Sequence, residues 1–213
     1  MINIYFFGDS ISFGQGISIE KNWVTKIGNL LNDGGQKVLI QNPSVNGNTT
    51  RMALERMPFD IQSHAVDFLI VTFGLNDCNY WLTDKGVPRV SPQGFEVNMK
   101  EIINRAFTFG VREVIVHTNH PSPRKDLMSG TDITYNQSNE LYNAVIRKVA
   151  SDCKKVRFVD IYKTMMKLVE LGCRTISDFT QEDGIHLSET GNDIYYKEIG
   201  NLLKSMVSEI SHT

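Results

Sequence analysis

A serine in the segment Gly8-Asp9-Ser10-Ile11 stands where an apolar run ends and a glycine-rich turn begins. The run Ile2 to Phe7 precedes it, and Gly14-Gln15-Gly16 follows closely. A serine at the end of a buried strand lies at the open edge of a sheet, where a substrate can reach it. A serine hydroxyl is a weak nucleophile until a base takes its proton, so the chain must also supply a base, an orienting acid and oxyanion donors.

The segment Asp183-Gly184-Ile185-His186 supplies the base and the acid. Imidazole accepts and returns a proton readily at neutral pH, so His186 is the candidate base for Ser10. Asp183 lies three residues earlier, and Gly184 permits the tight turn between them. We therefore expect the Asp183 carboxylate to bind Nδ1 of His186, which leaves Nε2 facing Ser10.

Oxyanion donors follow the second and third apolar runs. Asn46-Gly47-Asn48 offers the backbone N–H of Gly47, and Gly74-Leu75-Asn76-Asp77 offers the side-chain amide of Asn76. The backbone N–H of Ser10 is the third candidate donor. Three such donors would stabilise the negative charge that develops on an ester carbonyl oxygen during acyl transfer.

Apolar runs that end in turn residues predict five strands. The run Ile2 to Phe7 is almost continuously apolar, which is typical of a strand covered on both faces in a parallel sheet. The expected strands cover residues 2–7, 37–41, 67–73, 111–118 and 156–160.

Segments with apolar residues at helical spacing separate these strands. The expected helices run from Trp23 to Leu31, from about Thr49 or Thr50, from Ser91-Pro92 to Phe107, from Tyr135 to Cys153, from Tyr162 to Leu171, and from about Ser188 onward. This alternation predicts an α/β protein with a parallel sheet and helices on both faces. At 213 residues we expect one domain over residues 1–213.

In such folds ligands bind beyond the carboxyl ends of the strands. Ser10, Gly47, Asn76 and His186 all follow predicted strands and are therefore expected at one rim. Residues 119–134 leave the fourth strand at the same rim and lack periodicity, so we expect them to form a wall or lid of the pocket.

The charge, the apolar runs and the cysteines of the chain restrict its expected binding partners, location and thiol state. The net charge is −2, and no basic block or basic stripe with aromatics is present, which argues against nucleic acid and anionic membranes as partners. No apolar run approaches the roughly 18 residues of a membrane helix, and no basic segment precedes the first run, so we expect a cytoplasmic protein. Three cysteines without a C-x-x-C pair favour reduced thiols over a disulfide framework.

The four polar blocks resemble those of the SGNH hydrolase superfamily, the GDSL esterases and lipases. The matching blocks are Gly8-Asp9-Ser10-Ile11, Gly47, Gly74-Leu75-Asn76-Asp77 and Asp183-Gly184-Ile185-His186, in the family's order and over almost the whole chain. Ile11 stands where leucine is usual. The resemblance implies a three-layer α/β/α fold of flavodoxin-like type and no metal or organic cofactor. It also implies Ser10, Gly47, Asn76 and His186 as signature positions, with Asp183 completing a catalytic triad.

Other interpretations of these residues remain open at this point. Ser10 could cap a helix, Asn76 could cap a turn, and Asp183 with His186 could be ordinary polar residues or two metal ligands without a third. The chain has no G-x-S-x-G elbow or phosphate loop, and Gly14-Gln15-Gly16 lacks the third glycine of a dinucleotide fingerprint.

The residues favour a serine esterase that cleaves short acyl esters of a carbohydrate or another small polar alcohol. Tyr80 and Trp81 are candidate pocket walls, although both could be core residues, and Arg124 with Lys125 could meet a polar or anionic alcohol portion. The alternatives are a thioesterase or lysophospholipase for longer acyl chains and a catalytically silent small-molecule binding module. We expect a small-molecule ester as the partner; the sequence does not give the oligomeric state.

Overall fold

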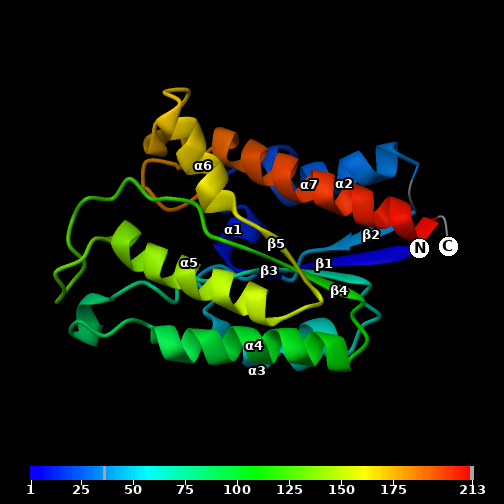
Figure 1. The fold of residues 1–213 in the computed structure, drawn as a ribbon, viewed down its shortest axis with the longest axis horizontal. Helices are drawn as coiled ribbons and strands as arrows, with labels where there is room; N and C mark the ends of the chain where they lie inside the picture. Colours follow the sequence, from blue (N-terminus) through cyan, green and yellow to red (C-terminus); the bar gives the residue numbers. More distant parts are fainter. Residues whose placement is uncertain (36, 212–213) are drawn as a thin grey trace.

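A parallel β-sheet lies between two layers of helices in the computed structural model, which describes residues 1–35 and 37–211 (Figure 1). Within the described residues the sheet has five strands in the order β2-β1-β3-β4-β5, and all neighbouring pairs are parallel. The strands are β1 (Ile2–Gly8), β2 (Val38–Gln41), β3 (Phe68–Thr72), β4 (Glu113–His117) and β5 (Val156–Val159). The predicted α/β/α architecture is confirmed.

The helices form one layer on each face of the sheet (Figure 1). One layer holds α2 (Trp23–Asp33), α6 (Ile161–Glu170) and α7 (Glu189–Ser211), and the other holds α3 (Thr50–Met57), α4 (Pro92–Thr108) and α5 (Tyr135–Asp152). Short helical turns occupy the loops: α1 (Ser10–Phe13), η1 (Ile19–Lys21), the π-helical η2 (Pro58–Gln62), η3 (Leu82–Asp84) and η4 (Ile176–Phe179). No described helix combines the length and the apolar character that crossing a bilayer requires.

Observed strands lie within a few residues of the predicted ones, but the segment after β1 differs from the prediction. The sequence indicated a glycine-rich turn, whereas Ser10 is the first residue of the helical turn α1. Asp9 caps this turn, and Gly14 ends it with a φ of 86° in the left-handed region. Four helical residues suffice because the cap at each end satisfies backbone groups that the short helix leaves free.

The core aromatic residues fix the backbone around α1. Phe6 of β1 meets the ring of Trp23 edge to face at 5.2 Å between centroids. Trp23 is fully buried, and its Nε1–H donates a hydrogen bond of 2.9 Å to the carbonyl of Ile11. A buried indole N–H needs such a partner, so packing of α2 on the sheet also sets the position of α1.

Arg56 of α3 joins the loops that follow the first two strands. Its Nη2 donates to the Gly8 carbonyl at 2.9 Å, its Nη1 to the Pro43 carbonyl at 2.5 Å, and its Nε to Oδ1 of Asn48 at 2.6 Å. Asp60 forms an ion pair with the same guanidinium. One side chain thus holds together the segments that carry the candidate nucleophile and a candidate oxyanion donor.

Candidate active site

Ser10 lies at the carboxyl end of strand β1, between β2 and β3, with its side chain directed into the rim of the sheet. Asp9 caps the helical turn because its Oδ1 accepts a 3.0 Å hydrogen bond from the N–H of Ile11. Asp9 thereby supports the turn that carries Ser10. Ser10 is mostly buried, so its hydroxyl is held in place rather than freely solvated.

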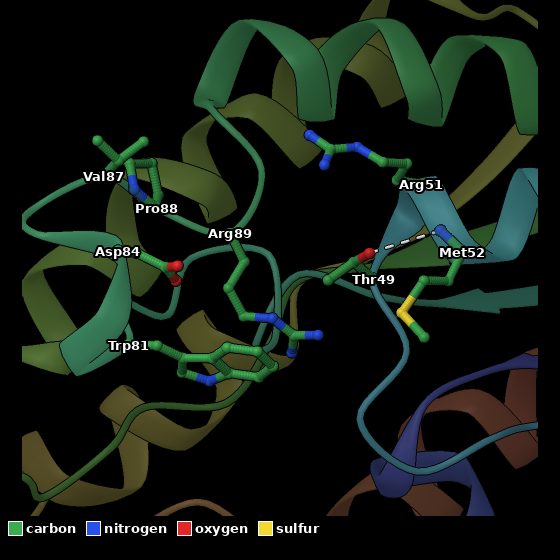
Figure 2. Close-up of a pocket in the computed structure, with 8 residues that line it drawn as sticks. All are labelled: Thr49, Arg51, Met52, Trp81, Asp84, Val87, Pro88 and Arg89. Carbon is green, nitrogen blue, oxygen red and sulfur yellow. Dashed lines mark hydrogen bonds between the residues drawn. The ribbon is translucent and has the colours of Figure 1, made fainter.

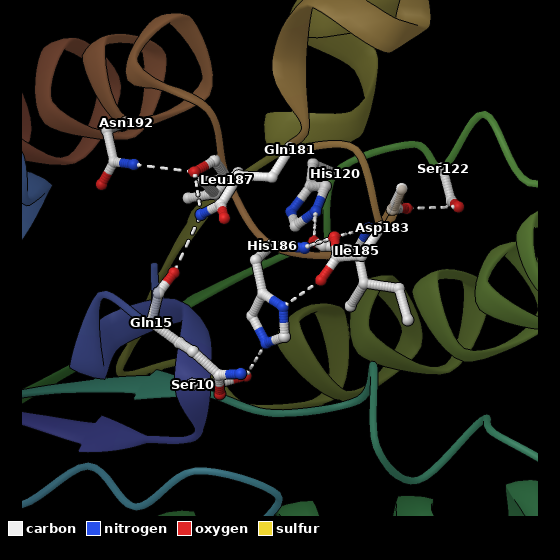
Figure 3. Close-up of polar contacts among 11 residues, drawn as sticks. Ser10, Gln15, His120, Ser122, Gln181, Asp183, Ile185, His186, Leu187 and Asn192 are labelled. Atoms are coloured by element: carbon white, nitrogen blue, oxygen red, sulfur yellow. Dashed lines mark hydrogen bonds and ion pairs between the residues drawn. The ribbon is translucent and has the colours of Figure 1, made fainter. Parts of the chain in front are cut away.

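His186 and Asp183 meet Ser10 at this rim (Figure 3). Nε2 of His186 lies 3.0 Å from Oγ of Ser10, and Nδ1 of His186 lies 2.5 Å from Oδ2 of Asp183. Oδ1 of Asp183 accepts hydrogen bonds of 2.9 Å from the N–H groups of both Ile185 and His186. The three side chains therefore form one chain of contacts across 176 residues of sequence.

The charge of Asp183 is stabilised by these contacts. Partial burial alone would raise the pKa of Asp183, but hydrogen bonds from the Ile185 N–H and from the side chain and N–H of His186 outweigh it and hold the pKa below its usual value. Asp183 is therefore ionised at neutral pH. An ionised carboxylate at Nδ1 places the imidazole proton on that nitrogen and leaves Nε2 free to accept a proton from Ser10.

The three candidate oxyanion donors are the backbone N–H groups of Ser10 and Gly47 and the side-chain amide of Asn76. Within residues 1–35 and 37–211 the backbone N–H groups of Ser10 and Gly47 donate to no protein acceptor. Gly47 has a φ of 76°, and an added Cβ would meet nothing within 4 Å, so the backbone conformation and not space favours glycine there. Both N–H groups are free to bind a ligand oxygen.

Asn76 is oriented from both ends of its amide. Nδ2 of Asn76 donates to Oδ2 of Asp9 at 3.1 Å, and Oδ1 of Asn76 accepts from Nη1 of Arg89 at 3.3 Å. An amide nitrogen carries two hydrogens, so one N–H of Asn76 remains available for a ligand. Nη1 of Arg89 also donates to the Gly47 carbonyl at 3.1 Å, which joins two of the donor residues.

Two buried carboxyl groups lie behind the donors. Burial, with a smaller contribution from the charge of Asp77, raises the pKa of Asp9 to about 7, against the hydrogen bonds from Ile11 and Asn76. Burial likewise raises the pKa of Asp77 to about 6, although Asp77 accepts from the N–H and hydroxyl of Thr50 at 3.0 and 2.5 Å. Asp9 accepts from a backbone N–H and a side-chain amide, and Asp77 accepts from a backbone N–H and a hydroxyl, so both carboxyl groups shape the rim.

A polar clamp holds the loop that carries His186, and the sequence analysis missed it (Figure 3). Nε2–H of His120 donates to the Ile185 carbonyl at 2.7 Å, and the Ser122 hydroxyl donates to the Gly184 carbonyl at 2.7 Å. Nδ1 of His120 accepts from the Tyr195 hydroxyl at 3.0 Å, which fixes the tautomer. The clamp consists of His120 and Ser122, and its contacts with the His186 loop are to the backbone carbonyls of Gly184 and Ile185.

The clamp residues are themselves fixed by asparagines on one face of α5. The contacts are Asn119 N–H to Asn143 Oδ1 at 2.7 Å, Asn139 Nδ2 to the His120 carbonyl at 2.8 Å, and Ser122 N–H to Asn136 Oδ1 at 2.8 Å. Asparagines at 136, 139 and 143 recur at helical spacing, and this pattern was the available sequence signal for a polar contact of α5.

The first residues of the segment 119–134 have a structural role that the sequence did not predict, and the wall or lid stays a prediction for the rest of the segment. Asn119, His120 and Ser122 are buried and support the His186 loop from below. Farther along, an added Cβ on Gly86 would lie 2.5 Å from the Gly130 carbonyl oxygen, so the tip of the segment packs against the loop after η3. The first part of the segment is structural because buried polar groups there need partners, which hydropathy patterns do not reveal.

The predicted substrate-binding residues lie in different places. Trp81 is half exposed and lines a cavity of about 360 Å³ (Figure 2). Tyr80 is partly buried against the core and does not line this cavity. Arg124 is exposed beside the His186 loop, where an added Cβ on Gly184 would lie 2.8 Å from its Cγ, and its guanidinium lies 5.5 Å from the Tyr135 ring centroid.

A comparison with protein families matches residues 6–194 to the GDSL-like lipase/acylhydrolase family. The chain belongs to this family. It is a carboxylic ester hydrolase of the GDSL type, and a catalytic triad and an oxyanion hole are typical of the family. The match runs from the strand before Ser10 into the last helix, so it includes the candidate triad, the candidate oxyanion donors and the clamp residues.

Named relatives differ in what they act on. The chain is 29% identical over 114 residues to an arylesterase of Vibrio mimicus, which covers 54% of this chain and 53% of the relative. It is 25% identical over 181 residues to thioesterase 1/protease 1/lysophospholipase L1 of Escherichia coli strain K12, which covers 84% of this chain and 72% of the relative. The first alignment thus spans only about half of the arylesterase.

A solved structure shares the fold. An acetylxylan esterase from Geobacillus stearothermophilus superposes with a TM-score of 0.76 at 19% sequence identity, covering 95% of this chain and 93% of that chain. At this level of identity the likeness supports the fold alone.

The clamp predicts a pH dependence of stability. Burial lowers the pKa of His120 to about 4, while an unfolded histidine titrates near 6.5. The unfolded chain therefore binds more protons between these values, so the stability contributed by neutral His120 is present above pH 6.5 and is lost as pH falls toward 4. From pH 7 to pH 5 this loss is about 2 kcal/mol, and the His120→Gln variant should lack it.

Urea unfolding of wild type and His120→Gln at both pH values measures this difference. The Tyr195→Phe variant is the matched control because it removes the hydroxyl partner but keeps the buried imidazole, so it should retain the wild-type pH dependence. If the free energy of unfolding of His120→Gln fell between pH 7 and pH 5 as much as that of wild type, the assignment of a buried neutral imidazole would be contradicted.

Proposed function

We propose that the protein is a serine esterase that hydrolyses short-chain acyl esters of small polar alcohols, such as O-acetyl groups on a carbohydrate, through an acyl-Ser10 intermediate. The observation that carries the proposal is the pair of contacts at His186, 3.0 Å to Oγ of Ser10 and 2.5 Å to Oδ2 of Asp183. Free N–H groups of Ser10 and Gly47 lie at the same rim. A binding module would not need a hydroxyl within reach of an oriented base.

In the acylation step, Nε2 of His186 takes the Ser10 hydroxyl proton while Oγ attacks the ester carbonyl carbon. The carbonyl oxygen becomes negative and accepts hydrogen bonds from the N–H groups of Ser10 and Gly47 and from the Asn76 amide. The imidazolium then gives its proton to the departing alkoxide, and the alcohol leaves. In deacylation, His186 takes a proton from a water molecule as the water oxygen attacks the acyl carbon; the bond to Oγ breaks, the acyl group leaves as the carboxylic acid, and the imidazolium returns the proton to Ser10 Oγ.

Asp183 and the clamp support this proton transfer. The ionised Asp183 carboxylate stabilises the imidazolium that forms on His186 and keeps its tautomer fixed. The clamp residues His120 and Ser122 hold the two carbonyls before His186, which limits movement of the imidazole relative to Ser10. Positioning of this kind matters because a displacement of about 1 Å can lower a rate by roughly a hundredfold.

A cavity lies next to the oxyanion donors, and its lining favours a short acyl group over a long one. Half of its eight lining residues are polar or charged, namely Thr49, Arg51, Asp84 and Arg89, so it offers a long acyl chain no continuous apolar wall. A long acyl chain gains about 0.8 kcal/mol per buried methylene only where the lining is apolar. The name of the acetylxylan esterase agrees with a short acyl group.

A second candidate is a thioesterase or lysophospholipase that acts on longer acyl chains. It is favoured by a groove of about 670 Å³ beside α1, α2 and β2, whose lining includes the apolar residues Phe13, Ile17, Ile19 and Leu39. The name of the Escherichia coli relative points the same way. A small ester remains the proposed partner, and the cytoplasmic location remains a prediction from the sequence.

The first prediction from this function is that Ser10→Ala and His186→Ala each remove nearly all turnover of 4-nitrophenyl acetate. The double variant should be little worse than either single variant, because triad residues act as a unit and their losses do not add. Steady-state rates measure this. If the two single losses multiplied, the shared role would be wrong, and failure of a fluorophosphonate probe to label Ser10 in folded wild type would favour the silent binding module.

A second prediction concerns Asn76. Asn76→Ala should lower kcat by roughly a hundredfold with little change in KM, because the amide serves charge that exists only in the transition state. Asn104→Ala, an exposed asparagine on α4, is the control and should keep the wild-type kcat. An effect on KM alone would place Asn76 in ground-state binding instead.

A third prediction separates the two acyl classes. We expect kcat/KM on 4-nitrophenyl esters to peak between acetate and butyrate and to fall toward palmitate, because the cavity beside the donors is charged. A palmitate optimum that Phe13→Asp abolishes, while acetate turnover persists, would instead assign the acyl chain to the groove beside α1.

A further inference from the structure

The cavity beside the oxyanion donors contains two arginines, and the acylation mechanism gives neither of them a role. We call it the arginine pocket; it is lined by Thr49, Arg51, Met52, Trp81, Asp84, Val87, Pro88 and Arg89 (Figure 2). Its volume of about 360 Å³ suits a ring-sized group. Because Arg89 contacts both Gly47 and Asn76, the pocket is separated from the reacting carbonyl only by the donor residues.

Arg89 is fixed in a way that leaves one edge of its guanidinium open. Its Nη1 donates to the Gly47 carbonyl at 3.1 Å and to Oδ1 of Asn76 at 3.3 Å, and its Cζ lies 4.1 Å above the Trp81 ring. In the described part of the chain, Nε and Nη2 of Arg89 bind no acceptor. These two N–H groups lie on the same edge and match the two oxygens of a carboxylate.

Partial burial strengthens the attraction of this open guanidinium edge for an anion. Partial burial lowers the pKa of Arg89, while the charges of Asp77 and Asp84 act in the opposite direction. A guanidinium that has lost part of its hydration gains more from an incoming anion than a fully solvated one. The Trp81 face and the two acceptors also remove most of the rotamer freedom that binding would otherwise have to restrict.

Arg51 supplies a second cation at the pocket. It lies in the first turn of α3, is exposed, and has no hydrogen bond or ion pair to another residue in the described ranges. Asp84 is the only acidic side chain among the lining residues, so positive charge predominates in the pocket. Unpaired and partly paired arginines around one cavity favour an anionic group.

We propose that the arginine pocket binds a carboxylate carried by the alcohol portion of the ester, so that the natural substrate is an O-acylated hydroxy acid such as an acylated sugar acid. The assignment to the alcohol portion rests on the proposed function, because an acetyl to butyryl group is used up at Ser10 and the donors. One carboxylate fits the open edge of Arg89, and Arg51 adds attraction from the opposite side of the pocket.

The test compares 4-acetoxybenzoate with its neutral isostere 4-acetoxybenzamide. The measured quantity is the ratio of kcat/KM for the acid to kcat/KM for the amide. Release of the phenol is monitored to obtain both values. Wild type should favour the acid by about tenfold at low ionic strength, and the ratio should fall as salt is added. Arg51→Gln should lower the ratio about fivefold, and Arg51→Glu should lower it further, below the value for Arg51→Gln.

Arg112→Gln is the matched control. Arg112 is an exposed arginine that precedes β4 and pairs with Asp67 at the amino-terminal edge of the sheet, far along the strands from Ser10. Its removal changes the net charge by the same amount, so it should leave the ratio at the wild-type value. Differences in the intrinsic reactivity of the two esters cancel when variants are compared.

Two kinetic outcomes would overturn the proposal, and a binding measurement decides if neither aryl ester reacts. If the ratio of acid to amide were equal in wild type and Arg51→Glu, Arg51 would not contribute to carboxylate binding. Turnover of the amide in the same experiment would show that the esterase function itself stands. A charge preference seen for ethyl hydrogen succinate over ethyl pentanoate, but not for the acetoxybenzoate pair, would move the carboxylate to the acyl portion. If neither aryl ester is hydrolysed, calorimetry measures the binding of 4-hydroxybenzoate to wild type and to Arg51→Glu. Equal affinity would contradict the proposed pocket. Binding about tenfold weaker to the variant would support it.

Discussion

The contact between Oγ of Ser10 and Nε2 of His186 is the constraint on which the rest of the structure depends. Its length of 3.0 Å joins the end of the first strand to a loop just before the last helix. Hydrogen bonds weaken within a few tenths of an ångström, so both segments must be placed to that accuracy. The parallel sheet brings them to one rim, and Trp23 then fixes the turn that carries Ser10.

The final placement comes from buried polar contacts and not from the apolar core. The His186 loop is bound through the carbonyls of Gly184 and Ile185, and the clamp below it is bound in turn by asparagines of α5. In a medium of low dielectric constant each of these bonds is strong when made and expensive when broken. Such a network has one well-defined arrangement, which an apolar contact of the same size would not impose.

The sequence predicted the architecture and the meeting of Ser10, Asp183 and His186, because strand periodicity and short tethers are local properties. It did not predict the roles of His120, Ser122 or Arg56, whose partners are mostly backbone carbonyls distant in the chain. Carbonyl acceptors have no residue-type signature, so no motif marks them. The helical turn at Ser10 was also missed, since its stability comes from Asp9 and from packing under Trp23 more than from helix propensity.

The clamp has a further consequence for how the sequence of the His186 loop can change over time. His120 and Ser122 bind main-chain oxygens, which every amino acid possesses, so their grip does not depend on the side chains of the residues they hold. Gly184 is constrained by its left-handed φ of 69° and Ile185 packs against the core, but the exposed Glu182 is under no such demand. A lineage or an engineer can therefore alter the charge at position 182, four residues before His186, without displacing the imidazole.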